Sequence, residues 1–267
     1  MQKTGKNRNT IDKFYTNPDI VKKYIHQFTP YLKPDDLIIE PSAGSGVWTI
    51  PLRNYNLIAF DIQPEGGGIQ QADFLYVDLY AFQSNLHFIG NPPFGRQSSL
   101  AKRFIKHICA CEKTQTIAFV LPKSFKKDSF KKVFPPKFHL VYQDDVGKDA
   151  FLANGKPYDV PCIFQIWIRR NFDREIPETL KPIGFKFVKK HENPDYSLRR
   201  VGVYAGKLDT VIEDKSTQSH YFIKLNENSD RFASKYNMVE WEHNNTVGPR
   251  SISKQEFIKV LNKLVCL

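Results

Sequence analysis

The sequence has little cysteine and no long apolar segment. Its 267 residues include four cysteines, Cys109, Cys111, Cys162 and Cys266. So few cysteines exclude the disulfide framework of a small secreted domain, and we expect an intracellular, reducing compartment, the cytoplasm or the nucleus. No run reaches the 18 or so apolar residues of a transmembrane helix. Residues 1–10 are polar and basic, so we expect neither a secretory signal there nor a membrane partner.

The chain is also poor in acidic residues relative to basic ones. Its 39 Lys and Arg against 28 Asp and Glu give a net charge of +11 and a pI near 9.3. This excess favours a polyanionic partner, although a basic solvated surface gives the same sum. Apolar residues make up 41% and aromatic residues 13%. These values exclude disordered and collagen-like classes and suffice for one large α/β core with a small appendage.

Basic residues gather in three stretches of the chain. They are Lys102, Arg103, Lys106 and His107; Lys123, Lys126, Lys127, Lys131, Lys132 and Lys137; and Lys186, Lys189, Lys190, Arg199 and Arg200. Phenylalanines interleave with the second stretch, at positions 125, 130, 134 and 138. Surfaces that hold a phosphate backbone and stack bases combine the same residue types. The candidate substrate contacts are therefore Lys123, Phe125, Lys126 and Lys127, with an ordinary solvated surface as the alternative.

Short apolar segments alternate with amphipathic ones, which is typical of an α/β fold. We expect strands over residues 37–39, 57–60, 87–89, 116–121 and 160–168. Asn17 and Pro18 predict a helix cap and the first helical residue, and apolar residues follow at helical spacing as far as Phe28. A second helix, basic on one side, is expected around residues 100–108. These elements predict a mostly parallel, twisted sheet with helices on both faces.

The chain becomes more polar after Arg170, and we place a domain boundary there. Residues 1–170 form the predicted main domain, and residues 171–267 a small α+β extension that we expect to contact substrate. A hairpin is predicted near Phe185–Val188. A last helix is predicted from Ser253, where Ser253 and Glu256 can form a capping box.

A glycine-rich loop follows the first predicted strand. Residues 40–46 read Glu-Pro-Ser-Ala-Gly-Ser-Gly. In an open α/β sheet, ligands bind at the carboxyl ends of strands, where glycines let the backbone approach them. Asp61 comes 21 residues after Glu40, at the end of the next strand, where a carboxylate can accept hydrogen bonds from ribose hydroxyls. The third glycine of a dinucleotide loop is missing after Gly46, but with Asp73 near a following strand the pattern favours an adenosine-bearing cofactor.

The most specific motif is the sequence Gly-Asn-Pro-Pro-Phe-Gly at residues 90–95. Residues 91–94 resemble the catalytic tetrapeptide of the N6-adenine methyltransferases that depend on S-adenosylmethionine. The resemblance covers most of residues 13–170. The order of its motifs is similar to that of the gamma-class enzymes, and also to that of viral, microbial and eukaryotic RNA adenosine methyltransferases with Asn-Pro-Pro-Phe.

The resemblance implies a fold, a cofactor and a reaction. The fold is a Rossmann-like class I methyltransferase core with a cofactor-capping helix over residues 13–30, and the cofactor is S-adenosyl-L-methionine. The reaction is direct in-line methyl transfer to N6 of a flipped-out adenine in DNA, with RNA, cap or structured, as the alternative. The implied catalytic residues are Asn91, Pro92, Pro93 and Phe94. The implied cofactor contacts are Phe14, Tyr15, Thr16, Glu40, Pro41, Ser42, Ala43, Gly44, Gly46, Asp61, Ile62, Asp73, Phe74 and Asn91. No metal is implied, and the oligomeric state stays open.

The tetrapeptide also makes chemical sense without the family. Adenine N6 is a poor nucleophile because its lone pair is delocalised into the ring. If the Asn91 side-chain oxygen and the Pro92 carbonyl each accept an N6–H hydrogen bond, the nitrogen is drawn toward tetrahedral geometry. Two prolines stiffen the loop and hold these acceptors in place. Phe94 can stack on the base, and no tuned general base is needed because the proton can leave after transfer.

Other features of the sequence admit competing interpretations. His107, Cys109 and Cys111 suggest zinc, but on a helix they share no face and no second ligand pair exists. Cys162 follows a proline, as a nucleophilic cysteine of cytosine methylation does, yet it lies in an apolar strand and is interpreted as core. Core positions are also expected for Trp48 and Trp167. A solvated loop is expected for Asp144, Asp145 and Asp149.

Two rival functions remain. Asn-Pro-Pro-Tyr occurs in enzymes that methylate a glutamine amide in proteins, since that acceptor is again a planar NH2. Phe94 in place of Tyr and the basic, aromatic segment over residues 123–138 favour nucleic acid. A catalytically inactive nucleic-acid-binding module is the other rival, and the intact set of Asp61, Asp73 and Asn91 argues against it.

Overall fold

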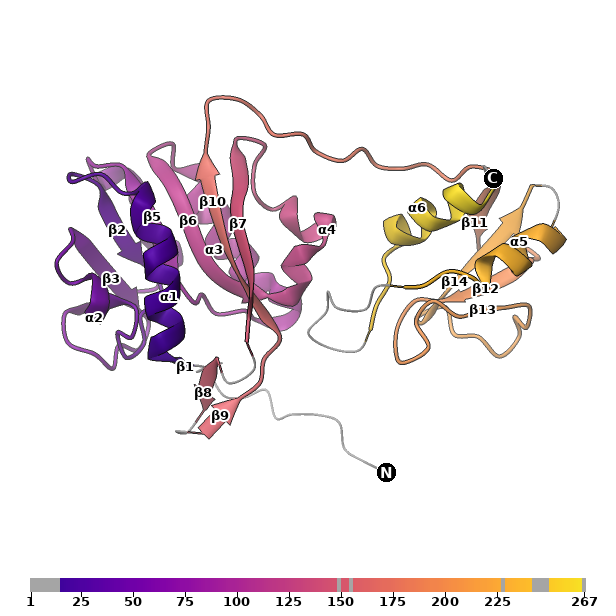
Figure 1. Ribbon diagram of the computed structural model, residues 1–267, viewed down its shortest axis with the longest axis horizontal. Coiled ribbons are helices and arrows are strands. Elements are labelled where there is room, and N and C mark those ends of the chain that lie inside the picture. The colour runs from indigo at the N-terminus through magenta and orange to yellow at the C-terminus, as the bar shows by residue number, and fades with distance from the viewer. Residues whose placement is uncertain (1–14, 148–149, 154–155, 227–228, 242–249, 266–267) are drawn as a thin grey trace. The chain divides into compact units, whose positions relative to one another are not determined.

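The computed structural model describes residues 15–147, 150–153, 156–226, 229–241 and 250–265. Phe14, Asp149 and Cys266 lie outside the described residues. The chain divides into two compact units, residues 1–176 and residues 177–267, and each is described by itself (Figure 1). None of the helices in the described ranges is long and apolar enough to cross a membrane.

A seven-stranded sheet forms the centre of the first unit. Its order is β4-β3-β2-β5-β6-β10-β7. The strands are β2 (Leu37–Glu40), β3 (Leu57–Asp61), β4 (Ile69–Gln71), β5 (Leu86–Gly90), β6 (Thr114–Pro122), β7 (Phe138–Val146) and β10 (Cys162–Arg169). Strands β4, β3, β2, β5 and β6 pair in parallel, and β10 runs antiparallel to both β6 and β7. This sheet confirms the predicted Rossmann-like, mostly parallel fold, and all five predicted strands are present.

Helices cover both faces of this sheet because the strands are apolar on both sides. On one face, Ile38, Val120 and Phe164 pack with α1 (Pro18–Phe28) and α2 (Thr49–Leu52). On the other, Ile39 and Phe119 pack with α3 (Ser99–Ala110), near α4 (Asp128–Lys131). Single 3-10 turns join these elements: η1 (Thr29–Tyr31), η2 (Phe74–Tyr76), η3 (Leu79–Ala81), η4 (Arg96–Ser98) and η5 (Lys123–Lys126). Successive strand residues thus serve two separate cores, as in other parallel sheets.

Helix α1 begins as the sequence predicts and is shorter than the helix implied by the resemblance. The Asn17 side chain accepts a hydrogen bond from the Asp19 amide at 3.0 Å, and Pro18 is the first helical residue. The helix covers residues 18–28 rather than 13–30. Tyr24 on its buried face stacks on Phe164 of the sheet with ring centroids 4.0 Å apart. The helix therefore packs along the sheet (Figure 1).

The residues before α1 belong to a second, small sheet. Strand β1 (Tyr15–Thr16) pairs antiparallel with β8 (Phe151–Ala153), which pairs with β9 (Lys156–Tyr158). The Asn17 amide donates to the Ala150 carbonyl at 2.8 Å. This sheet, which the sequence did not predict, fixes Tyr15 and Thr16 beside the main sheet.

Asp144 and Asp145 lie in strand β7 and not in a solvated loop, so that prediction is wrong. The Asp144 carboxylate accepts from Lys23 at 2.5 Å and from the Tyr24 hydroxyl at 3.1 Å. Asp145 pairs with Lys126 at 2.7 Å. Both aspartates link the sheet to elements that cover it.

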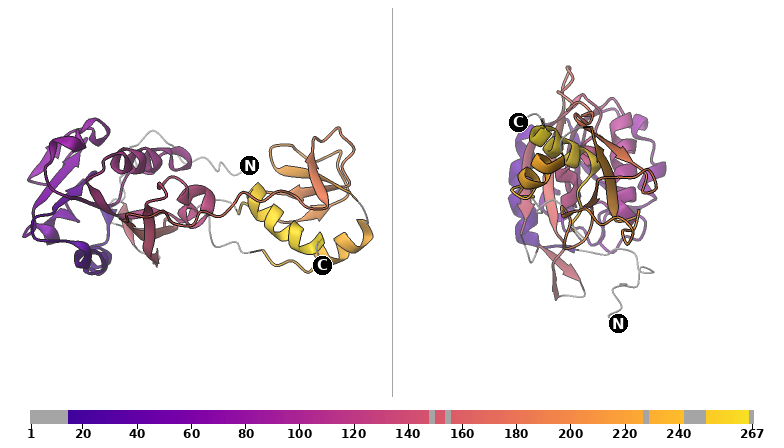
Figure 2. Two further views of the ribbon diagram at one scale, coloured as in Figure 1. Left: turned by 90° about the horizontal axis from the view of Figure 1, so that it is seen from above. Right: turned by 90° about the vertical axis from the view of Figure 1, so that its right-hand side faces the viewer.

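The second unit is an antiparallel sheet with two helices. The order is β11-β14-β12-β13. The elements are β11 (Phe185–Val188), β12 (Tyr196–Arg199), β13 (Leu208–Asp209), β14 (His220–Leu225), α5 (Ser229–Tyr236) and α6 (Lys254–Val265). The helices pack with the sheet around Leu198, Ile223 and Phe257 (Figure 2). The hairpin predicted near residues 185–188 is wrong, because β11 pairs with β14, far along the chain.

The start of α6 is the predicted capping box. The Ser253 amide donates to Glu256 Oε2 at 2.7 Å, and the Glu256 amide donates to Ser253 Oγ at 3.3 Å. Each side chain thus satisfies one backbone amide that the helix leaves without an internal acceptor.

Candidate functional site

The carboxyl ends of the parallel strands meet around a cavity of about 410 Å³. Glu40 ends β2, Asp61 ends β3, Asp73 follows β4 and Asn91 follows β5, and all four line this cavity. Strand order reverses between β2 and β5, and such a reversal is where open α/β sheets bind their ligands. Residues that are distant in sequence therefore converge on one site.

The cavity collects most of the predicted site residues. Those lining it are Tyr15, Thr16, Glu40, Pro41, Ser42, Ala43, Gly44, Asp61, Ile62, Asp73, Phe74, Asn91, Pro92, Pro93 and Phe94. Gly46 does not line it and faces a separate hollow beside Arg53 and residues 66–68. None of the residues of α1 is part of the lining.

The Asp61 carboxylate is held by backbone amides. Its Oδ2 accepts from the Gly44 amide and its Oδ1 from the Gln63 amide, each at 2.7 Å. Gly44 has φ +54°, a conformation that glycine adopts without strain. Each oxygen keeps a further lone pair for a ligand, so the glycine loop and the Asp61 carboxylate form one prepositioned unit.

Glu40 lies deeper, beneath β5. A Cβ added at Gly90, where φ is +143°, lies 3.3 Å from Glu40 Cγ, so glycine leaves the room that the Glu40 side chain occupies. The side chain is buried, with 1% of the residue exposed. Burial, and then the charge of Asp61, raise the pKa of the Glu40 carboxyl well above its usual range, against an opposing effect of Thr49.

Two buried polar atoms around the cavity lack a hydrogen-bond partner among the described residues. They are Thr16 Oγ1 and the Trp48 indole nitrogen. Both residues line the cavity, as does Glu40, whose buried carboxyl interacts with Thr49. Because a buried polar group without a partner is costly, this end of the cavity fits a polar ligand that both donates and accepts hydrogen bonds.

The loop of residues 91–94 is fixed at both ends. The Ser42 hydroxyl donates to the Asn91 carbonyl at 3.1 Å, and the Phe94 carbonyl accepts from the Leu100 amide at 3.1 Å. Gly95 has φ +66°, and a Cβ there would lie 2.9 Å from Leu100 Cγ. The tetrapeptide is therefore anchored to the glycine loop on one side and to the start of α3 on the other.

Tyr15 closes one side of the glycine loop. Its hydroxyl donates to Glu65 Oε2 at 2.5 Å, and the Glu65 amide donates to the Gly44 carbonyl at 2.9 Å. Burial, followed by the hydrogen bond to Glu65, raises the pKa of Tyr15 to about 12. Tyr15 is thus a neutral hydrogen-bond donor at ordinary pH.

Apolar and aromatic side chains also line the cavity, among them Phe74 and Phe104. The buried Phe74 ring lies 5.4 Å from the Phe104 ring and 5.3 Å from His107, centroid to centroid. His107 Nε2 lies 3.0 Å from the Val77 carbonyl. Asp73 caps this turn by accepting from the Leu75 amide at 3.1 Å. Next to the polar groups of the lining, the cavity therefore has apolar surface that a flat ring can contact.

Sequence reasoning missed several lining residues. They are Val47, Trp48, Gln63, Glu65, Ala72, Leu75, Leu100, Arg103 and Phe104. Most flank predicted motifs and carry no signal of their own. Leu100, Arg103 and Phe104 are spaced three and four apart on α3, and this helical spacing after the tetrapeptide is the pattern by which they could have been found.

The predicted substrate contacts do not line the cavity. Phe125 is fully buried, with its ring 5.3 Å from that of Phe130, so its assignment as a base-stacking residue is wrong. Lys123 and Lys126 pair with Asp145 at 3.5 and 2.7 Å. Phe134 and Phe138 of the same stretch are also buried in the core. The aromatic part of this basic segment therefore stabilises the fold.

The three described cysteines, Cys109, Cys111 and Cys162, are buried. Among the described residues, no group of three or more His, Cys, Asp or Glu is placed to hold a metal ion. Cys162 belongs to the core, as predicted. Burial raises the pKa of Cys109 to about 12 and that of Cys162 further still, which leaves both as thiols and not nucleophilic thiolates.

Comparisons with known proteins give matches to solved structures alone. No family model matches the sequence, and no curated protein matches it. The 23S rRNA methyltransferase ErmE superposes with a TM-score of 0.45 and 16% identity, over 61% of this chain and 71% of ErmE.

Two further solved structures are similar to the same extent. A type I restriction-modification methyltransferase subunit from Streptococcus thermophilus gives a TM-score of 0.42 and 14% identity, over 61% of this chain and 46% of that one. A tRNA methyltransferase from M. jannaschii gives 0.40 and 19%, over 59% and 49%. Similarity at this level carries no inference about function.

Proposed function

We propose that this protein transfers a methyl group from S-adenosyl-L-methionine to N6 of adenine in nucleic acid. The observation that carries the proposal is the single cavity in which the Asn91–Phe94 loop meets Glu40, Asp61 and Phe74. The residues proposed for catalysis and those proposed for cofactor contact lie far apart along the chain and line the same cavity, which supports the proposal.

The residues around the cavity fit this cofactor at both ends. The Asp61 carboxylate, held by two amides, would accept from ribose hydroxyls, and the apolar surface around Phe74 and Phe104 would take the adenine ring. Thr16 and Trp48 offer buried polar atoms without partners among the described residues, and the buried Glu40 carboxyl lies in the same lining. These would hold the ammonium and carboxylate of the methionine moiety. When bound, the cofactor supplies an activated methyl group on a positively charged sulfur.

The chain's own contribution to the reaction is positioning of the acceptor nitrogen. The Asn91 side-chain oxygen and the Pro92 carbonyl would accept the two N6–H hydrogen bonds, which localises the nitrogen lone pair. The Ser42 hydroxyl and the Leu100 amide hold the loop before substrate arrives, so these acceptors need no reorganisation. Alignment of the two reacting atoms then accounts for much of the acceleration.

Phe94 would hold the base itself. Its ring is partly buried and lines the cavity beside Asn91, so an adenine rotated out of a strand can stack on it. In a duplex this rotation costs a few kcal/mol. Arg103 is the single basic side chain in the described lining of the cavity, and it can meet a phosphate next to the rotated nucleotide.

Nucleic acid is favoured over a protein amide as the acceptor. The first unit carries 24 Lys and Arg against 17 Asp and Glu, a net charge of +7 that suits a phosphate backbone. We propose DNA as the substrate on the gamma-like order of the motifs, with RNA as the alternative. A glutamine amide has no comparable charge to match.

Methyl transfer from labelled cofactor to matched DNA and RNA pools tests the proposal. We expect radioactivity in one pool and N6-methyladenine, or its ribonucleoside, on mass analysis of the digested nucleosides. The Asn91→Ala variant is the matched control and should transfer nothing. Calorimetric binding of the cofactor without transfer to either pool would contradict the proposal.

A further inference from the structure

The loop between β12 and β13 exposes two apolar side chains in the second unit. Val203 is 76% and Tyr204 72% exposed, whereas the next residue, Ala205, is 6% exposed. An apolar pair this exposed in the middle of an ordered loop contributes nothing to the core of the unit. Two adjacent exposed apolar side chains offer a surface that a partner can cover.

The backbone of this loop is nonetheless tightly held. The Gly206 amide donates to the Arg199 carbonyl at 2.7 Å, and the Arg199 amide donates to the Lys207 carbonyl at 2.8 Å. The Tyr236 hydroxyl donates to the Gly206 carbonyl at 2.6 Å. Gly206 has φ +97°, and a Cβ there would lie 2.5 Å from Trp241 Cδ1. The loop thus rests directly on the helical side of the unit.

The other end of the loop is fixed in the same way. The Gly202 amide donates to the Arg250 carbonyl at 2.9 Å, and Ile252 donates to the Arg200 carbonyl at 2.8 Å. Between these anchors, the Ala205 amide donates to the Gly202 carbonyl at 3.0 Å, which closes a turn around Val203 and Tyr204. The two exposed side chains therefore stand on a rigid platform and need little ordering on binding.

Three basic residues belong to the loop or to the strand before it. They are Arg199, Arg200 and Lys207, and the nearest acidic residues along the chain are Asp195 and Asp209. Lys207 is exposed, as is Arg250 beside Gly202. The Arg200 guanidinium is fixed 5.4 Å from the Tyr221 ring and donates to the Tyr221 hydroxyl at 3.2 Å. An aromatic ring on a rigid loop with cations around it matches the chemistry of single-stranded nucleic acid, in which base faces are open and phosphates run alongside.

We propose that the loop of residues 200–207 binds unpaired nucleotides of the substrate, with Tyr204 stacked on a base and Lys207 and Arg250 facing phosphates. Val203 packs against the same base or its sugar. A paired base inside a duplex has both faces covered, so the loop selects single strands, ends or bulges. This inference rests on the proposed function in that the nucleic acid is the substrate of the site in the first unit.

Binding of labelled oligonucleotides to the full-length protein tests the loop. Fluorescence anisotropy is measured with single-stranded DNA, single-stranded RNA and the matching duplexes. We expect Tyr204→Ala to weaken single-strand binding by about tenfold and Tyr204→Phe, which keeps the ring, to stay within about twofold. Duplex binding should not change. Lys207→Gln should reduce the salt dependence of single-strand binding by about one ion.

Met238→Ala is the matched control, since Met238 is an 83% exposed apolar side chain elsewhere in the same unit. It should bind like the unchanged protein. Single-strand affinity in Tyr204→Ala equal to that of the unchanged protein overturns the inference. So does a change of molar mass by light scattering in Tyr204→Ala with nucleic-acid affinity intact, because the loop would then join two copies of the chain.

Methylation assays separate this inference from the proposed function. If nucleic acid is methylated, Tyr204→Ala should raise KM for a single-stranded substrate about tenfold with kcat and cofactor affinity unchanged. If Tyr204→Ala methylates with the same KM as the unchanged protein, the inference about the loop is wrong and the proposed function is unaffected. If the unchanged protein methylates no nucleic acid but still binds single strands in a way that depends on Tyr204, the proposed function is wrong and the inference about the loop holds.

Discussion

The Gly44 amide donates a hydrogen bond to Asp61 Oδ2 at 2.7 Å, and this bond ties the end of β2 to the end of β3. The same carboxylate accepts from the Gln63 amide at 2.7 Å through its other oxygen. Asp61 therefore shapes the loop that approaches the cofactor and also offers it acceptors. These two roles can be separated by substitution.

Replacing Asp61 should impair cofactor binding before it impairs anything else. Asp61→Ala removes the acceptors of two amides and those proposed for the ribose hydroxyls, and we expect cofactor affinity to fall by about tenfold to a hundredfold. Asp61→Asn keeps one acceptor oxygen and should lose less. Calorimetric titration with the cofactor measures both variants, and unchanged affinity in Asp61→Ala would remove Asp61 from the site.

Replacing Asn91 should abolish transfer and leave cofactor binding nearly intact. The Asn91→Ala variant lacks the side-chain oxygen proposed to accept an N6–H, while the Asn91 carbonyl that Ser42 binds is still present. We expect no measurable methyl transfer and a cofactor affinity within about tenfold of the unchanged protein. Transfer from labelled cofactor and calorimetry give the two readouts. A fully active variant would refute the role of Asn91.

The parts of the fold predicted from sequence are those that local patterns determine. Strands β2, β5 and β6 are buried on both faces, and each contains consecutive apolar residues, at positions 37–39, 88–89 and 117–121. Strand β7 is mostly half-buried or exposed and carries Asp144 and Asp145 just before its last residue, Val146. It was missed because it lies at the edge of the sheet, where only one face needs apolar side chains.

The site residues that could be predicted from the sequence belong to recognisable motifs. Those that only the folded chain brings to the cavity could not be predicted. Asp61 and Asn91 stand in recognisable motifs, but nothing in the sequence shows that Trp48 turns its indole toward the same cavity. Phe125 shows the converse. Lysines surround it in sequence, yet the η5 turn directs its ring into the core. Which side of a short turn is buried depends on tertiary packing, which charge patterns do not encode.

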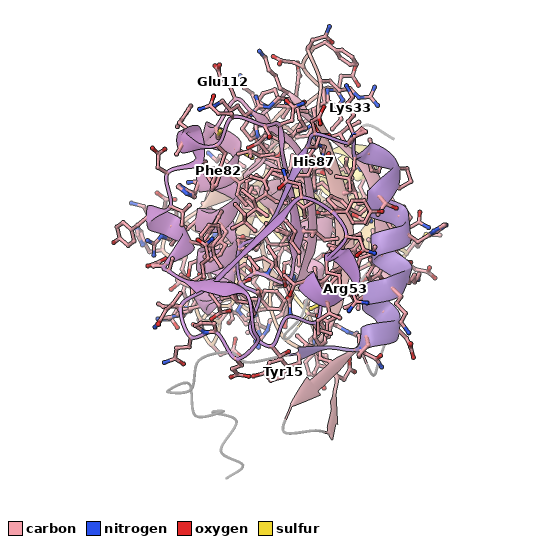
Figure 3. The ribbon with its side chains drawn as sticks, turned by 90° about the vertical axis from the view of Figure 1, so that its left-hand side faces the viewer. Tyr15, Lys33, Arg53, Phe82, His87 and Glu112 are labelled. Carbon is pink, nitrogen blue, oxygen red and sulfur yellow. The ribbon has the colours of Figure 1, made fainter. Side chains whose placement is uncertain are left out.

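The buried pair of His87 and Asp36 should make the protein less stable in acid. His87 lies toward the opposite end of the first unit from Tyr15 (Figure 3). His87 Nε2 lies 2.9 Å from Asp36 Oδ2, and both side chains are buried. Burial lowers the pKa of His87 below its ordinary 6.5 despite the opposing charge of Asp36. Below pH 6.5 the His87 side chain is therefore protonated in the unfolded chain, whereas in the folded chain it binds the proton only at lower pH. The free energy of unfolding falls as the pH falls through this range.

Asp36 extends this loss to lower pH. Hydrogen bonds from the Lys33 amide and the Asn85 side chain lower the pKa of Asp36 below its ordinary 3.8, against the effect of burial. The contribution of the Asp36 carboxylate to stability is present above pH 3.8 and is lost as the pH falls through the lower pKa of the folded chain.

Urea unfolding of the protein and of His87→Asn, between pH 7 and pH 5, measures the part of this pH dependence that comes from His87. An equal pH dependence in the two proteins would contradict it.

The glycine at the end of β5 should be irreplaceable for both stability and cofactor binding. Gly90 has φ +143°, which a residue with a Cβ adopts only under strain, and an added Cβ would press on Glu40 Cγ at 3.3 Å. We expect Gly90→Ala to lower the free energy of unfolding by about 2 kcal/mol. We also expect weaker cofactor binding, because Glu40 must move. Gly67→Ala is the matched control, since an added Cβ there meets nothing within 4 Å. Urea denaturation and calorimetry should find Gly67→Ala unchanged, and a Gly90→Ala variant equal to it in both measurements would show that Glu40 does not depend on the space at Gly90.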